Sequence, residues 1–124
     1  MSPAVWRDLA ATWWPRDAVE ATGPDAVSFL QGQLSQDVAA MGAGASALSW
    51  LLQPQGKVVA LVRVTKVDGS RLVIDTDAGW GEAVLERLSR FKLRVRCDLA
   101  PLAGWRCLAV RGDRAREVDA AGAA

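Results

Sequence analysis

Apolar and polar residues recur along this chain with the periods of short strands and of two helices. Asp17–Thr22 alternates in polarity, as a half-buried strand does. Pro24–Gly32 carries its apolar residues at helical spacing and begins with a proline, which suits the first turn of a helix. Turns rich in glycine then separate three predicted strands, which are Ser46–Gln53, Lys57–Val67 and Arg71–Thr76.

A second helix is predicted over Ala78–Lys92, with Asp77 as its N-cap. The apolar side chains that should face the core from this helix are Trp80, Val84, Leu88 and Phe91. Two further strands are predicted at Leu93–Cys97 and Trp105–Gly112. The order of these elements predicts an α+β fold, a ferredoxin-like (split βαβ) antiparallel sheet with an added hairpin and with helices on one face.

The two ends of the chain lack this periodicity. Residues 1–15 form a lead-in segment that we expect to end at Pro15. Its large apolar side chains, which should pack on the domain, are Trp6, Trp13 and Trp14. Residues 16–111 form the predicted domain, and residues 112–124 form a small, polar, flexible tail.

Composition and charge exclude several classes of function. The 124 residues carry a net charge of +1, which gives no electrostatic case for a nucleic acid or an anionic membrane as partner. The chain has no histidine, so Ser-His-Asp and Cys-His catalysis is excluded and no metal site is expected. Cys97 and Cys107 fit buried free thiols, with a disulfide between them as the alternative. Neither a signal peptide nor a membrane span is found, so we expect a cytoplasmic protein.

The long predicted strand Lys57–Val67 has two unlike faces, because strand residues alternate sides. Its even positions are all apolar and should meet the helices; they are Val58, Ala60, Val62 and Val64. Its odd positions mix apolar residues with Lys57, Arg63 and Thr65. Mostly apolar surfaces with a few polar groups are typical of small-molecule sites. Charges that discourage aggregation at a sheet edge are the other interpretation, and the pattern alone leaves both open.

Two motifs add a family resemblance. They are GPDAVSFLQGQLSQDV at Gly23–Val38 and LLQPQGKVVALVRV at Leu51–Val64. Together they resemble the YgfZ-type folate-binding proteins, which are relatives of the glycine-cleavage T-protein aminomethyltransferases. The similarity covers roughly residues 15–111. It implies the folate-binding domain of that superfamily, with tetrahydrofolate or a derivative as cofactor and no metal.

The resemblance gives the mixed sheet face a candidate role as a folate-binding wall. The residues assigned to this wall are Leu48, Trp50, Lys57, Leu61, Arg63, Thr65 and Asp75. Trp50 could stack on a pterin ring, and Arg63 or Lys57 could meet the glutamate carboxylates of a folate. Packing against another domain is the alternative role of the same face. We expect Asp37 to make a local turn bond, and Gln31 and Gln33 to close the first helix.

Two departures from the family pattern shape the functional hypothesis. The second aspartate of the enzymes' G-G-x-x-D-D motif falls on Leu61, and leucine cannot accept a proton. The family's K-G-C-x-x-G-Q-E motif is absent, and family members are much longer. We therefore expect either the first part of a longer protein or a truncated relative, whose partner is a missing C-terminal half or a second protomer.

The resemblance implies a non-enzymatic folate-binding domain that supports iron–sulfur protein assembly or maintenance and folate-dependent tRNA modification. No catalytic residue is assigned. One alternative is a folate-dependent aminomethyl or one-carbon transferase that uses another carboxylate, such as Asp75. Another is a protein-interaction module without a ligand.

Overall fold

The structure, a computed structural model, describes residues 10–103 and 106–111, the backbone alone for 10–13 and 106–111. Its elements are β1 (Ala10–Thr22), α1 (Ala26–Gln33), β2 (Ser46–Leu52), β3 (Val58–Asp68), β4 (Arg71–Asp77), α2 (Gly81–Arg90), β5 (Asp98–Leu102) and β6 (Arg106–Arg111). The chain divides into two compact units, of which the larger spans Asp17–Gly104. In the smaller unit, the first part of β1 pairs with β6.

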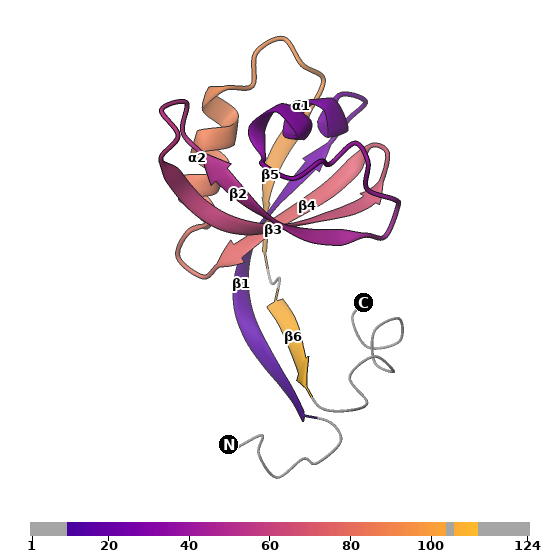
Figure 1. The fold of residues 1–124 in the computed structure, drawn as a ribbon, viewed down its shortest axis with the longest axis vertical. Coiled ribbons are helices and arrows are strands. Elements are labelled where there is room, and N and C mark those ends of the chain that lie inside the picture. The colour runs from indigo at the N-terminus through magenta and orange to yellow at the C-terminus, as the bar shows by residue number, and fades with distance from the viewer. Residues whose placement is uncertain (1–9, 104–105, 112–124) are drawn as a thin grey trace. The chain divides into compact units, whose positions relative to one another are not determined.

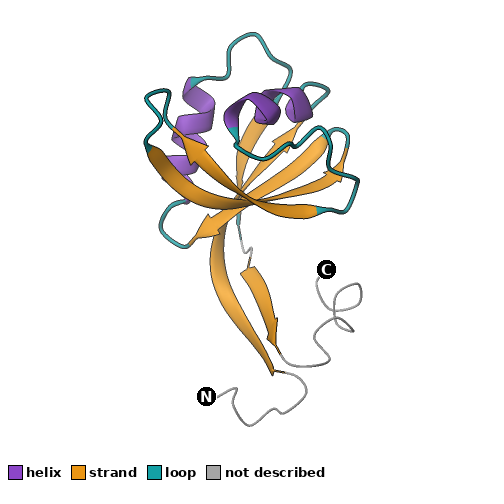
Figure 2. Cartoon of the chain, viewed as in Figure 1, coloured by secondary structure: helices purple, strands orange, loops and turns teal. Residues whose placement is uncertain are grey.

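The sheet of the larger unit has the strand order β2-β3-β4-β1-β5. The β2–β3, β3–β4 and β1–β5 pairs are antiparallel. Both helices lie on the same face of this sheet (Figures 1 and 2). The predicted α+β class, an antiparallel sheet with helices on one face, is confirmed.

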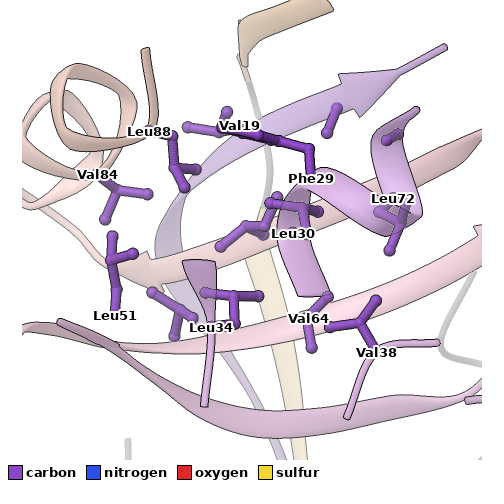
Figure 3. Packing of buried hydrophobic residues seen from close by; sticks show 14 of the residues in the cluster. Val19, Phe29, Leu30, Leu34, Val38, Leu51, Val64, Leu72, Val84 and Leu88 are labelled. Carbon is purple, nitrogen blue, oxygen red and sulfur yellow. The ribbon is translucent and has the colours of Figure 1, made fainter. Parts of the chain in front are cut away.

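The hydrophobic core lies between this face and the two helices (Figure 3). Phe29 and Leu30 of α1, together with Val84 and Leu88 of α2, are buried in it. The sheet residues of the cluster are Val19, Ala21, Leu51, Ala60, Val62, Val64, Leu72 and Ile74. Three of the four even positions predicted for the long strand are therefore in the core, and the fourth, Val58, is exposed.

The start of α1 explains why the predicted strand Leu93–Cys97 does not form. The Asp25 carboxylate accepts the Arg96 N–H at 2.8 Å, and the Asp25 N–H donates to the Arg96 carbonyl at 3.1 Å. Gly23 makes this approach possible, because a Cβ there would lie 2.3 Å from the Arg96 oxygen. The backbone around Arg96 is thus bound to the start of α1, and the strand forms immediately after the predicted one, as β5.

The second helix is shorter than predicted, and a distant residue holds its start. It begins at Gly81, with Trp80 rather than Asp77 at the N-cap position. The Asp17 carboxylate of β1 accepts the N–H groups of Gly79 and Gly81. The predicted burial of Trp80 is wrong, since that side chain is 53% exposed.

The C-terminal end of α2 differs from the prediction as well. Phe91 was expected in the core but is exposed, with the Arg87 guanidinium 4.3 Å from the centre of its ring. The helix ends before Phe91, so the apolar stripe that faces the core is reduced to Val84 and Leu88. The i,i+4 ion pair between Glu86 and Arg90 is on the solvent side.

The lead-in segment also differs from the prediction. β1 runs through Pro15, so this proline does not end the segment, and Trp14 is exposed rather than packed. Trp6, the Trp13 side chain and the predicted tail lie outside the described residues. Among the described residues, no helix has the length and apolar character needed to cross a bilayer.

Candidate functional site

The strand register brings six of the seven predicted site residues onto one face of the sheet. This face is opposite the core, and we refer to it as the open face. Leu48, Arg63 and Asp75 form one row across β2, β3 and β4. Trp50 and Leu61 form a second row, and Ser46 and Thr65 a third. Because side chains opposite one another in paired strands lie within about 5.5 Å at Cβ, these rows form one continuous surface.

Part of the open face is apolar and in contact with water. Leu48 is 55% exposed, Trp50 48%, Val58 57% and Leu61 44%. We call these four residues the β2–β3 patch. Scattered exposed apolar residues are ordinary, but a contiguous group on neighbouring strands indicates a surface that binds something.

A β-bulge places Val58 in the patch and separates Lys57 from it. Leu51 pairs with Ala60, but Leu52 pairs with Val58, so Val59 is an extra residue in β3. Val58 therefore points to the open face, and Val59 packs against the core, which reverses the prediction for both. Lys57 precedes β3, in the turn closed by the Gln53 N–H to the Lys57 carbonyl at 2.7 Å. It is exposed there and has no place in the three rows.

The polar members of the open face lie next to the patch. Arg63 stands between Leu48 and Asp75, and its side chain makes no hydrogen bond or ion pair with another described residue in its own unit. The Thr65 and Ser46 hydroxyls share a hydrogen bond of 2.7 Å. Asp75 is 3% and Val73 1% exposed, so the open face is buried at β4 and its exposed part lies on β2 and β3. Arg63 therefore places a cation next to the patch.

The segment that follows α1 holds the patch from the edge of the sheet. The Trp50 N–H donates to the Ser35 hydroxyl at 2.9 Å, and the Ser35 N–H donates to the Trp50 carbonyl at 3.1 Å. Leu34 forms an isolated bridge with Leu51 beside them. These contacts fix the backbone of Trp50 and give hydrogen-bond partners to its backbone N–H and carbonyl groups at the edge of β2. Sequence reasoning missed Ser35, although it lies in the motif that carries the resemblance.

Other residues of the two motifs have supporting roles. Gln33 accepts a hydrogen bond from Arg87 Nη1 at 2.9 Å, and Arg87 Nε donates to the Leu52 carbonyl at 2.9 Å. Arg87 thus joins α2 to α1 and β2. Gln31 accepts the Ala39 N–H, and Asp37 accepts the Ala40 N–H, which is the local turn bond predicted for Asp37.

The described residues contain no group of three or more His, Cys, Asp or Glu side chains that could hold a metal ion. Cys97 is a buried free thiol, and burial raises its pKa. The side chain of Cys107 is outside the described residues. Because Cys97 is a free thiol, the alternative of a disulfide between the two cysteines is wrong.

Comparison with known proteins relates this fold to a family. A family model described as the GCVT N-terminal domain matches residues 16–122. An uncharacterized protein of Haemophilus influenzae is 28% identical over 102 residues, which are 81% of this chain and 35% of that protein. The crystal structure of the glycine cleavage system aminomethyltransferase T from Bartonella henselae is similar with a TM-score of 0.76 and 25% identity. The match covers 90% of this chain and 31% of that one, so this chain spans about a third of both relatives. Because the family model covers most of the sequence, this protein belongs to the GCVT N-terminal domain family.

Proposed function

We propose that this chain is the N-terminal part of a tetrahydrofolate-binding protein and that the open face of its sheet contacts the ligand. The observation that carries the proposal is the β2–β3 patch with Arg63 beside it, in a domain of the GCVT N-terminal family. A solved relative is named as an aminomethyltransferase of the glycine cleavage system, which supports folate-related one-carbon chemistry.

The chemistry of the patch suits a ligand of this class. Trp50 offers a half-exposed indole against which a flat pterin ring can stack. Leu48 and Leu61 flank it with aliphatic surface. Arg63 can form a charge-assisted, two-pronged hydrogen bond with a carboxylate of the glutamate tail. Binding would also remove the patch from water, which is favourable at roughly 25 cal/mol per Å² of apolar area.

We propose further that the protein binds folate without catalysing aminomethyl transfer, as in the YgfZ-type proteins that it resembles. By the motif resemblance, Leu61 falls where the enzymes of the superfamily carry an aspartate, and it pairs with Trp50 within the patch. A leucine there can contact the ligand but cannot move a proton. Support of iron–sulfur protein maintenance and of tRNA modification is the downstream role that this resemblance suggests.

The test is calorimetric titration of the 124-residue chain with 5-formyltetrahydrofolate, with two matched pairs of variants. Trp50→Leu should weaken binding, and Phe91→Leu, which removes an exposed aromatic ring at the C-terminal end of α2, should not. Arg63→Gln should weaken binding roughly tenfold, because glutamine keeps one donor but loses the charge and the second hydrogen bond of the pair, and Arg94→Gln should leave it unchanged. Absence of binding by the unmodified chain would refute the proposal, and self-association in sedimentation would then favour an interaction module.

A one-carbon transferase is the second candidate, because a solved relative bears that name and a buried carboxylate, Asp75, shares a row with Arg63. In that case the chain should support aminomethyl transfer to tetrahydrofolate, and Asp75→Asn should abolish it without lowering ligand affinity to the same extent. Transfer activity that survives Asp75→Asn would exclude this carboxylate as the proton-moving group.

A further inference from the structure

We propose that Trp80 is a further ligand-contacting residue beside the β2–β3 patch and that Asp17 positions it. This inference rests on the proposed function. It extends the binding surface from the sheet to the turn between β4 and α2, which the sequence motifs do not include.

The capping of α2 does not explain why the Trp80 side chain is exposed. It occupies the N-cap position of α2, where its side chain makes no capping hydrogen bond. The indole is 53% exposed, while Val84, one helical turn later, is completely buried. A large aromatic side chain left half in water at a fixed position indicates a contact surface, since aromatic residues dominate the energetics of binding sites.

The strand register places this turn next to the patch. The Thr76 hydroxyl donates to the Leu61 carbonyl at 3.1 Å, so the end of β4 lies against Leu61. Asp77 follows, and the turn from Asp77 to Trp80 is closed by the Trp80 N–H to the Asp77 carbonyl at 3.1 Å. A turn of this kind keeps its first and last Cα atoms within about 7 Å. In Figure 1 the turn leaves the end of β4, the strand that neighbours β3.

Leu61 therefore lies between two indole-bearing segments. On its β2 side it pairs with Trp50, and on its β4 side lies the start of the turn that carries Trp80. Two strands on either side of β3 are about 10 Å apart, twice the spacing of neighbouring strands. Folates have two flat ring systems, the pterin and the aminobenzoyl group, joined by a short linker. Two tryptophan-bearing segments on either side of an apolar centre match a ligand of that form.

The turn that carries Trp80 is held by the carboxylate of a residue far away in the sequence. One oxygen of the Asp17 carboxylate accepts the Gly79 N–H at 2.9 Å and the Gly81 N–H at 3.0 Å, so it clamps the residues on both sides of Trp80. Gly79 has a φ of +99°, which favours glycine. A Cβ at Gly81 would lie 2.6 Å from the Asp17 Cβ. This clamp fixes the backbone of Trp80 before any ligand arrives, which lowers the entropy lost on binding.

The experiment is a double-mutant cycle measured by calorimetric titration of the full 124-residue chain with 5-formyltetrahydrofolate. Trp80→Leu should weaken binding on the order of tenfold, and Trp80→Phe, which keeps a ring, should weaken it less. Asp17→Ala should also weaken binding when Trp80 is present, but it should have no further effect in the Trp80→Leu background. A purely structural role of Asp17 would give the same loss in both backgrounds.

The outcomes separate this inference from the proposed function. If the unmodified chain binds 5-formyltetrahydrofolate, and Trp80→Leu and Trp80→Phe both bind it as tightly as the unmodified chain does, Trp80 makes no contact and the inference is wrong. If the unmodified chain does not bind, the proposed function itself fails. Thermal unfolding of each variant serves as the control, and Phe91→Leu removes an exposed aromatic ring at the other end of α2, whose loss should leave binding unchanged.

Discussion

The most informative perturbation of the sheet replaces one leucine on each of its faces with alanine. Leu61 of β3 is 44% exposed on the open face, and Leu51 of β2 is 0% exposed in the core. The two residues lie on neighbouring strands, because Leu51 pairs with Ala60 and Trp50 pairs with Leu61. The same substitution therefore tests whether the two faces differ in the way that the account requires.

The expected magnitudes follow from burial. Full burial of a leucine side chain is worth about 1.5–3 kcal/mol, and Leu61 has only about half of that burial. Leu61→Ala should thus lower the free energy of unfolding by about 1 kcal/mol. Leu51→Ala also leaves a cavity among the core residues, and such substitutions cost about 2–5 kcal/mol.

The assay is urea unfolding followed by circular dichroism, with the slope of the transition compared among the variants. Leu51→Ala should shift the midpoint by at least twice as much as Leu61→Ala. Equal losses of stability, or a larger loss for Leu61→Ala, would mean that Leu61 is enclosed in the folded chain, and the open face would have no apolar site at its centre.

Three further predictions concern residues that hold the fold. Arg87→Met removes two hydrogen bonds that join α2 to α1 and β2, and should lower the free energy of unfolding by about 2 kcal/mol in urea titrations, whereas Arg94→Met should have little effect. Gly23→Ala combines a φ of +128° with a Cβ 2.3 Å from the Arg96 oxygen, and should cost about 3 kcal/mol in the same assay; retention of wild-type stability would show that the turn can relax. Burial raises the pKa of the Cys97 thiol, so the neutral thiol is favoured in the folded state. The stability that this contributes is complete below the ordinary pKa of a thiol, near 8.5, and is lost as pH rises through the higher pKa of the folded state. Between pH 7 and 10 the urea midpoint of the unmodified chain should therefore fall more than that of Cys97→Val, and parallel profiles would contradict this assignment.

The parts of the fold that could be predicted from the sequence are those set by local periodicity. Alternation along β3 correctly placed Leu61, Arg63 and Thr65 on one face, because period two holds from Ala60 to Lys66. It failed at Val58, because a single extra residue in β3 reverses the sides and leaves no mark in the polarity pattern.

The remaining errors come from contacts between residues far apart in the chain. Trp80 was expected in the core because helical spacing extends to it, but Asp17 holds the helix start one residue later. The alternation of Leu93–Cys97 favours a strand, but the backbone of Arg96 is bound to the start of α1. Neither long-range hydrogen bond can be inferred from a local window, and both lie where glycines permit close approach.

The account depends on a tetrahydrofolate-type ligand lying on the β2–β3 patch, and methyl NMR tests this directly. Titration of the methyl-labelled chain with 5-formyltetrahydrofolate should shift the Leu48, Val58 and Leu61 signals in a saturable way. The Val64 and Leu72 signals, from completely buried residues of the opposite face, should move far less. Saturable shifts confined to the core residues, or no shifts at any ligand concentration, would contradict the account.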